Sequence, residues 1–124
     1  MVFIVVAAFL PLGYRWYNGR RAAPQSRPIS LHVAVGVVVA LTAFAHALFA
    51  VLSLGTAQAI GAGNLGLALG GIAVFVLMAH VGIGFQLRRP KLRDRPALRA
   101  KHRITALTIA SFAVAHTVIV FWNR

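Results

Sequence analysis

Residues 31–48 read LHVAVGVVVALTAFAHAL, and residues 101–122 read KHRITALTIASFAVAHTVIVFW. Each stretch belongs to an apolar segment of the length that a helix needs to cross a bilayer, about 20 residues. Each also holds two histidines 14 positions apart, His32 and His46 in the first and His102 and His116 in the second. Ionisable groups are costly inside a bilayer and usually serve a function, so these stretches decide both the fold and the candidate site.

The composition of the whole chain is that of an integral membrane protein. Of its 124 residues, 60% are hydrophobic, and its mean hydropathy is +0.81. It has 13 lysines and arginines against a single acid, Asp94. The basic residues cluster in two short segments between apolar runs, which excludes a soluble nucleic-acid-binding domain. The absence of cysteine excludes disulfides, iron–sulfur clusters held by thiolates and covalently attached c-type haem.

Four apolar segments predict an all-α membrane protein, a four-transmembrane-helix bundle that forms one domain over residues 1–124. The predicted spans are about 1–17, 28–54, 64–87 and 102–122. The first span is the shortest and contains Pro11. Its basic residues follow the apolar run instead of preceding it, so it does not have the pattern of a cleavable signal peptide.

The distribution of charge predicts the orientation of the bundle. Twelve of the 13 basic residues lie between spans one and two, or between spans three and four and at their edges, whereas residues 53–64 carry no charge. By the positive-inside rule, both basic segments face the cytoplasm of a bacterial inner membrane and both termini lie on the outer (periplasmic) side. Membrane lipid is therefore an expected partner, and some arginines are candidates for contacts with anionic headgroups or with a cofactor's acidic groups.

The 14-residue step places the two histidines of each span on one helix face. At about 100° per residue the second histidine returns to within roughly 40° of the first, and the two lie about 21 Å apart along the axis. Spans two and four also run in the same direction. Two such helices facing each other would pair His32 with His102 near the inner surface, and His46 with His116 toward the outer one.

Small residues separate the histidines on both faces, and such residues leave room for close helix packing or for a flat macrocycle between the helices. The two faces consist of His32, Gly36, Val39, Ala43, His46 and Ala50, and of His102, Ala106, Ile109, Ala113, His116 and Val120.

The paired histidines indicate haem ligation. A neutral imidazole on each side of a haem iron makes a six-coordinate electron carrier, and axial ligands of this kind tune its potential. A single intramembrane histidine more often hydrogen-bonds to a neighbouring helix, but two pairs at matched spacing favour ligation. Zinc is less favoured because the ligands form two separated pairs instead of one tetrahedral group. The two pairs are therefore predicted to ligate haem iron.

The two quoted segments resemble the haem-bearing helices of di-haem b-type cytochromes: the haem-binding four-helix half of cytochrome b and the ferric reductase-like and cytochrome b561-like membrane domains. The shared pattern is His, thirteen residues, His on two parallel helices, and the His102–Arg103 pair is similar to the ferric reductase group. The resemblance implies two b haems, with His32 and His102 on the inner iron and His46 and His116 on the outer iron. It also implies transmembrane electron transfer. Ala106 stands where that pattern has glycine, a quinol-oxidising loop motif is absent, and the chain has no flavin or nicotinamide domain. The resemblance therefore implies a small subunit or minimal electron conduit, not a complete enzyme. Its expected partners are separate redox donor and acceptor proteins or quinone, and membership of a larger membrane complex is a further alternative.

The sequence leaves several assignments open. His80 either hydrogen-bonds to a neighbouring helix or replaces one inner ligand. The inner haem's acidic groups have four basic candidates: Arg103, Lys101, Arg89 and Arg88. The competing functions are a (bacterio)chlorophyll-binding protein and a cofactor-free structural subunit of a membrane complex. A transporter is disfavoured, because no carboxylate lies within a span.

Overall fold

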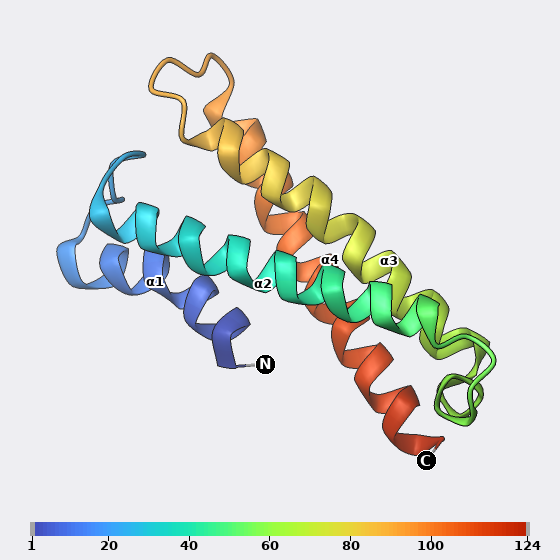
Figure 1. Cartoon of the computed structure of the whole chain (residues 1–124). Helices are drawn as coiled ribbons and strands as arrows, with labels where there is room; N and C mark the ends of the chain where they lie inside the picture. Colours follow the sequence, from blue (N-terminus) through green and yellow to red (C-terminus); the bar gives the residue numbers. More distant parts are fainter. Residues whose placement is uncertain (1, 124) are drawn as a thin grey trace.

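The computed structural model describes the backbone of residues 2–123 and the side chains of residues 9–56 and 63–123. The described chain is all-helical and contains no strand. Its elements are α1 (Val2–Asn18), α2 (Arg27–Leu52), α3 (Ala57–Leu87) and α4 (Arg95–Trp122), shown in Figure 1.

Three segments of the described chain are long and apolar enough to cross a membrane: Arg27–Leu52, Gly63–Leu87 and Arg95–Trp122. This agrees with a helical membrane protein. Helix α1 has 17 residues with Pro11 inside it, and it is not among the three. The expected fourth span therefore remains a prediction.

The long helices begin where the backbone chemistry favours a start. Proline occupies the first turn of α2 and of α4, where the missing N–H has no intrahelical partner to lose. Helix α4 begins at Arg95, seven residues before the predicted span at 102. Hydropathy does not detect its first two turns because they are rich in arginine and lysine. His102 consequently lies two turns inside the helix instead of at its end.

Helix α3 is interrupted near its start. Gly63 has φ 68° and ψ 157°, a conformation open to glycine but strained for residues with a Cβ. The long apolar segment begins at this residue, close to the predicted boundary at 64.

The side chain of Arg95 holds the turn between α3 and α4. Its guanidinium donates to the carbonyl oxygens of Leu87 at 2.8 Å, Arg89 at 2.5 Å and Pro90 at 3.1 Å. The last carbonyls of a helix have no partner within the helix, so this arginine satisfies groups that would otherwise need water. The resulting hairpin packs α3 and α4 side by side, antiparallel (Figure 1).

Helix α2 crosses this hairpin, and α1 packs against α2 (Figure 1). Within the described residues, no Cα atom of α2 lies within 8 Å of a Cα atom of α4. The surface area of 8951 Å² is well above the roughly 6,500 Å² of a compact soluble protein of this mass. The helices therefore form an open arrangement, with the backbones of α2 and α4 held apart.

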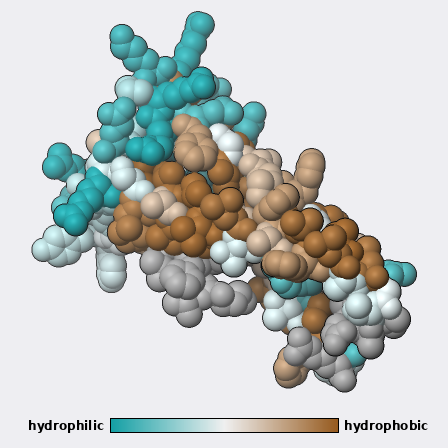
Figure 2. Space-filling model, viewed as in Figure 1, coloured by the Kyte–Doolittle hydropathy of each residue, from teal (hydrophilic) through white to brown (hydrophobic). Residues whose placement is uncertain are grey.

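The small core lies at mid-height. Ala40 of α2, Leu77 of α3 and Ile109 of α4 form one buried cluster. Large apolar side chains face outward elsewhere, such as Phe75 at 79% exposure, as expected of a surface that meets lipid. Figure 2 shows the hydrophilic residues gathered mainly at one end, over the α1–α2 and α3–α4 connections. The two basic segments thus share one end of the molecule.

Candidate functional site

The structure brings the four paired histidines together across the gap between α2 and α4. The ring centres of His32 and His102 are 6.1 Å apart, with 78° between the ring planes. The ring centres of His46 and His116 are 6.4 Å apart, with 71° between the planes. The first pair is at the basic end and is called the inner pair below; the second is called the outer pair. The two helices therefore run in the same direction and are in register at these two positions.

These separations fit a metal ion between the rings. An imidazole nitrogen lies about 2.0–2.1 Å from a bound first-row metal, and the ring centre lies about 1.1 Å behind that nitrogen. Two imidazoles on opposite sides of one ion thus have centres about 6.3 Å apart. Both observed separations are within 0.2 Å of this value.

The backbone of α3 orients His116 in the outer pair. Nδ1 of His116 lies 2.7 Å from the carbonyl oxygen of Gly66. A carbonyl only accepts, so Nδ1 carries the proton, and Nε2 of the neutral ring keeps its lone pair. This is the tautomer in which imidazole binds a metal, and the same kind of second hydrogen bond orients most metal-bound histidines. His46, its partner across the gap, is exposed.

Glycine gives His116 the space for this position. A Cβ atom on Gly70 would lie 3.0 Å from both Nδ1 and Cε1 of the His116 ring. Real Cβ atoms rarely come so close, so the ring packs directly on the Gly70 backbone. At the other end of the hairpin, a Cβ on Gly84 would lie 3.4 Å from Cε1 of His102. Gly70 and Gly84 are 14 residues apart, as are the two histidines that they face.

The inner pair is part of a group of three rings. His80 stacks on His102 with 3.8 Å between ring centres and 13° between planes. Nδ1 of His80 lies 2.8 Å from Oγ1 of Thr105. The Thr105 hydroxyl also lies 3.0 and 3.1 Å from the carbonyl oxygens of Lys101 and His102. His80 is thus fixed in position beside His102.

His102 itself is held differently from His116. Its Nδ1 is buried and has no hydrogen-bond partner among the described residues. Buried polar atoms without a partner are uncommon in native proteins and often mark functional sites. Stacking on His80 and packing on Gly84, instead of a hydrogen bond, set the orientation of this ring.

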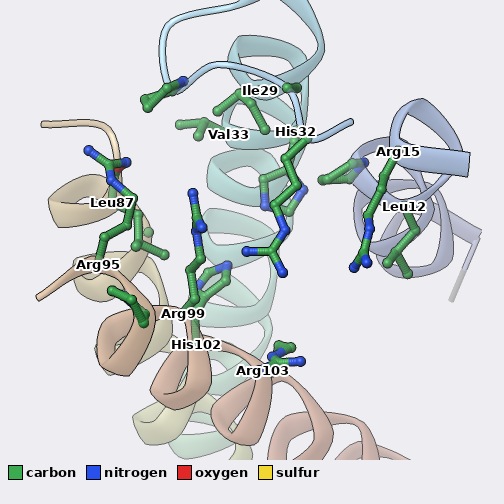
Figure 3. Close-up of a pocket in the computed structure, with 16 residues that line it drawn as sticks. Leu12, Arg15, Ile29, His32, Val33, Leu87, Arg95, Arg99, His102 and Arg103 are labelled. Carbon is green, nitrogen blue, oxygen red and sulfur yellow. The ribbon is translucent and has the colours of Figure 1, made fainter. Parts of the chain in front are cut away.

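A cavity of about 400 Å³ opens beside the inner pair, within the size range of ligand pockets. Residues of all four helices line it, including His32 and His102. Figure 3 shows Arg15 of α1 across the cavity from Arg95 of α4. The basic lining consists of Arg15, Arg21, Arg95, Arg99 and Arg103.

Arg103 is therefore the one predicted partner of acidic groups that lines this cavity. Arg88, Arg89 and Lys101 are not part of its lining, and Arg88 instead reaches the Ser30 hydroxyl at 3.5 Å.

The small residues predicted to lie between the histidines are in varied surroundings. A Cβ on Gly36 would meet nothing within 4 Å, Ala43 packs against the core cluster, Ala113 is half-buried and Ala106 is exposed.

The core cluster lies between the two pairs. Ala40 and Ile109 are each about midway between the two histidines of their helix, so an apolar layer separates the inner site from the outer one. In the described part of the chain, no group of three or more His, Cys, Asp or Glu side chains is arranged to hold a metal ion. An ion between two histidines would thus need its other donors from a bound group such as a macrocycle.

Sequence reasoning missed the stacking of His80, the glycines under the α4 histidines and the arginines from α1 and its following loop. The 14-residue spacing of Gly70 and Gly84 was a signal that could have identified the glycines under the α4 histidines.

Comparisons of the chain with protein-family models, with curated proteins and with solved structures find no match.

Proposed function

We propose that this protein is a di-haem b-type cytochrome that transfers electrons across a bacterial inner membrane. His32 and His102 would hold the inner haem, and His46 and His116 the outer one. The observation that carries the proposal is the pair of ring separations, 6.1 and 6.4 Å, on parallel helices whose backbones stay apart. A single pair is also compatible with the ordinary packing of two histidines, but two pairs at matched registers call for a common cause.

The residues around the rings also suit this role. Gly66 holds His116 in the metal-binding tautomer, Gly70 makes room for the ring, and the apolar layer around Leu77 lies between the sites. When bound, haem iron supplies one-electron ferric–ferrous chemistry, with a potential set by its axial ligands and their surroundings. The chain's own contribution is to orient the imidazoles and to place the two sites about 21 Å apart along the helices.

We further propose a four-span topology with both basic segments in the cytoplasm and both termini in the periplasm. The concentration of arginine and lysine at one end of the molecule supports it (Figure 2). Helix α1, with 17 residues, is at the lower limit for a span. Separate redox proteins or quinone would supply and accept the electrons.

The test is a reduced-minus-oxidised absorption spectrum of the purified chain, expressed with ample haem, with haem counted per protein. Sharp b-type bands and about two haems per chain support the proposal. Bound (bacterio)chlorophyll would support a pigment-binding protein instead. A chain that inserts and folds but contains no cofactor would support a structural subunit, and either result would refute the cytochrome proposal.

A further inference from the structure

The basic lining of the inner cavity has no acid to balance it. Arg15 belongs to α1, Arg21 to the following loop, and Arg99 and Arg103 to α4. No hydrogen bond or ion pair within the described residues engages any of these four side chains. Arg95 differs, because its guanidinium is occupied by the carbonyls of the α3–α4 turn. The chain's one acid, Asp94, does not line the cavity.

Like charges gathered around one cavity repel one another, and a bound anion would relieve this repulsion. The charges of Arg21 and Arg95 are close enough to Arg99 to repel it. Membrane orientation needs basic residues on this side, but it does not need them around one cavity. Arg20, Lys91 and Arg93 lie outside the cavity lining, so they satisfy the orientation rule without gathering around one cavity. The position of the cavity arginines therefore indicates an anionic ligand.

The position of helix α1 is a second observation that favours a ligand in this cavity. Within the described residues, no Cα atom of α1 lies within 8 Å of α3 or α4, so α1 packs on α2 alone. Its Leu12 and Arg15 nevertheless line the same cavity as Leu87 of α3 and Arg99 of α4. A ligand in this cavity would touch all four helices and would link α1 to α3 and α4, which it does not contact closely through its own backbone.

We infer that the two carboxylates of the inner haem bind between Arg15 and Arg21 on one side and Arg99 and Arg103 on the other, and that the cofactor thereby fastens α1 to the bundle. This inference rests on the proposed function. The cavity includes both His32 and His102, so a ligand held by these imidazoles reaches the arginines without leaving it. Apolar side chains such as Ile29 and Val33 complete the walls and suit a macrocycle's body. Guanidinium groups bind carboxylates with paired, charge-assisted hydrogen bonds.

The test compares haem with haem dimethyl ester, in which both carboxylates are blocked. Each is titrated into the full-length, haem-free protein in uncharged detergent, in a His46→Leu background that leaves the inner site alone. We expect the ester to bind roughly tenfold or more weakly than haem, the loss of about one charge-assisted hydrogen bond. In the Arg99→Gln/Arg103→Gln variant, the difference in affinity between haem and the ester should shrink, because two of the four guanidinium groups are gone. The matched control Lys91→Gln/Arg93→Gln should keep the full difference.

A second readout follows α1 directly. Trypsin cleavage after Arg15, Arg20 or Arg21 should slow when haem is bound, and should slow less with the ester. Equal protection by the two ligands would overturn the role of α1.

The outcomes separate the inference from the proposed function. If haem and its ester bind equally tightly to the inner site, the arginines do not hold the carboxylates, whereas the cytochrome proposal stands. If neither ligand binds, both ideas fail together. An anionic lipid headgroup shares the carboxylates' chemistry. If the Arg99→Gln/Arg103→Gln variant loses affinity for phosphatidylglycerol vesicles but keeps the haem-to-ester ratio, the arginines bind lipid and the inference is wrong.

Discussion

The inner and outer histidine pairs have nearly the same ring separation, yet the protein holds them by different means. In the outer pair, a backbone carbonyl fixes His116 by a hydrogen bond, and the ring rests on glycine. In the inner pair, His102 makes no such bond, and a third ring stacks against it. The inner site also borders a cavity rich in arginine. One spacing motif has thus produced two chemically distinct sites.

This difference has an electrostatic consequence. A hydrogen bond from Nδ1 to a carbonyl makes the imidazole a stronger donor, which favours the ferric state of a bound iron. Nearby guanidinium charges favour the state with one more electron. Both effects act in the same direction, so the outer site should have the lower midpoint potential. Electrons would then be more stable on the inner, basic side.

The largest expected effect is the loss of one site without the other. His116→Leu should remove the outer haem and leave the inner one, reducing the haem count from about two to about one. Thr117→Val is the matched control, because Thr117 is exposed and its hydroxyl only returns to the Ala113 carbonyl. Haem per chain and membrane insertion should be measured together. Retention of both haems by the inserted variant would disprove the outer ligand assignment.

A second experiment targets the glycine under His116. In Gly70→Ala, the new Cβ would lie 3.0 Å from the ring, so the ring or the α3–α4 packing must shift. Overpacking of this kind costs about 1–3 kcal/mol, and disturbed ligand support weakens a metal site roughly 10–100-fold. Gly71→Ala is the control, since a Cβ there meets nothing within 4 Å. Haem titration measures the effect. Equal affinities in the two variants would mean that the glycine does not set the outer ring's position.

The third experiment asks what His80 does in the inner site. If His80 positions His102, the His80→Leu variant should keep both haems but shift the midpoint potential of the inner haem by on the order of tens of millivolts. For a one-electron carrier, about 59 mV corresponds to a tenfold change in the redox equilibrium constant. Redox titration followed by optical spectroscopy measures this shift, with the outer haem as internal control. Loss of a haem would instead make His80 a ligand. An unchanged potential would reduce its role to packing.

The smallest effect is expected at Gly84. A Cβ there would lie 3.4 Å from Cε1 of His102, close to an ordinary contact, so a few tenths of an ångström of movement would relieve it. Gly84→Ala should therefore weaken inner haem binding by only a few fold, less than Gly70→Ala weakens the outer site. Gly82→Ala, which meets nothing within 4 Å, provides the reference. A larger loss at Gly84 than at Gly70 would reverse the ranking of the two sites by rigidity.

Much of this arrangement was predictable from the sequence because the relevant patterns are local. Hydropathy located the three long apolar segments, and the 14-residue step placed each histidine pair on one helix face. Hydropathy could not locate the start of α4 at Arg95, since a helix can continue through charged turns that extend out of the apolar run. The stack of His80 on His102 depends on the register between α3 and α4, which neither helix specifies by itself. The joining of Arg15 and Arg99 around one cavity likewise depends on how α1 lies relative to α4.

The most direct test of the central claim is the identity of the axial ligands in the purified, oxidised protein. Near-infrared magnetic circular dichroism and electron paramagnetic resonance, combined with haem counting, report ligand type and spin state for each site. The account predicts about two low-spin haems per chain, both with two imidazole ligands. A single haem, a high-spin haem or an axial ligand other than histidine at either site would contradict it.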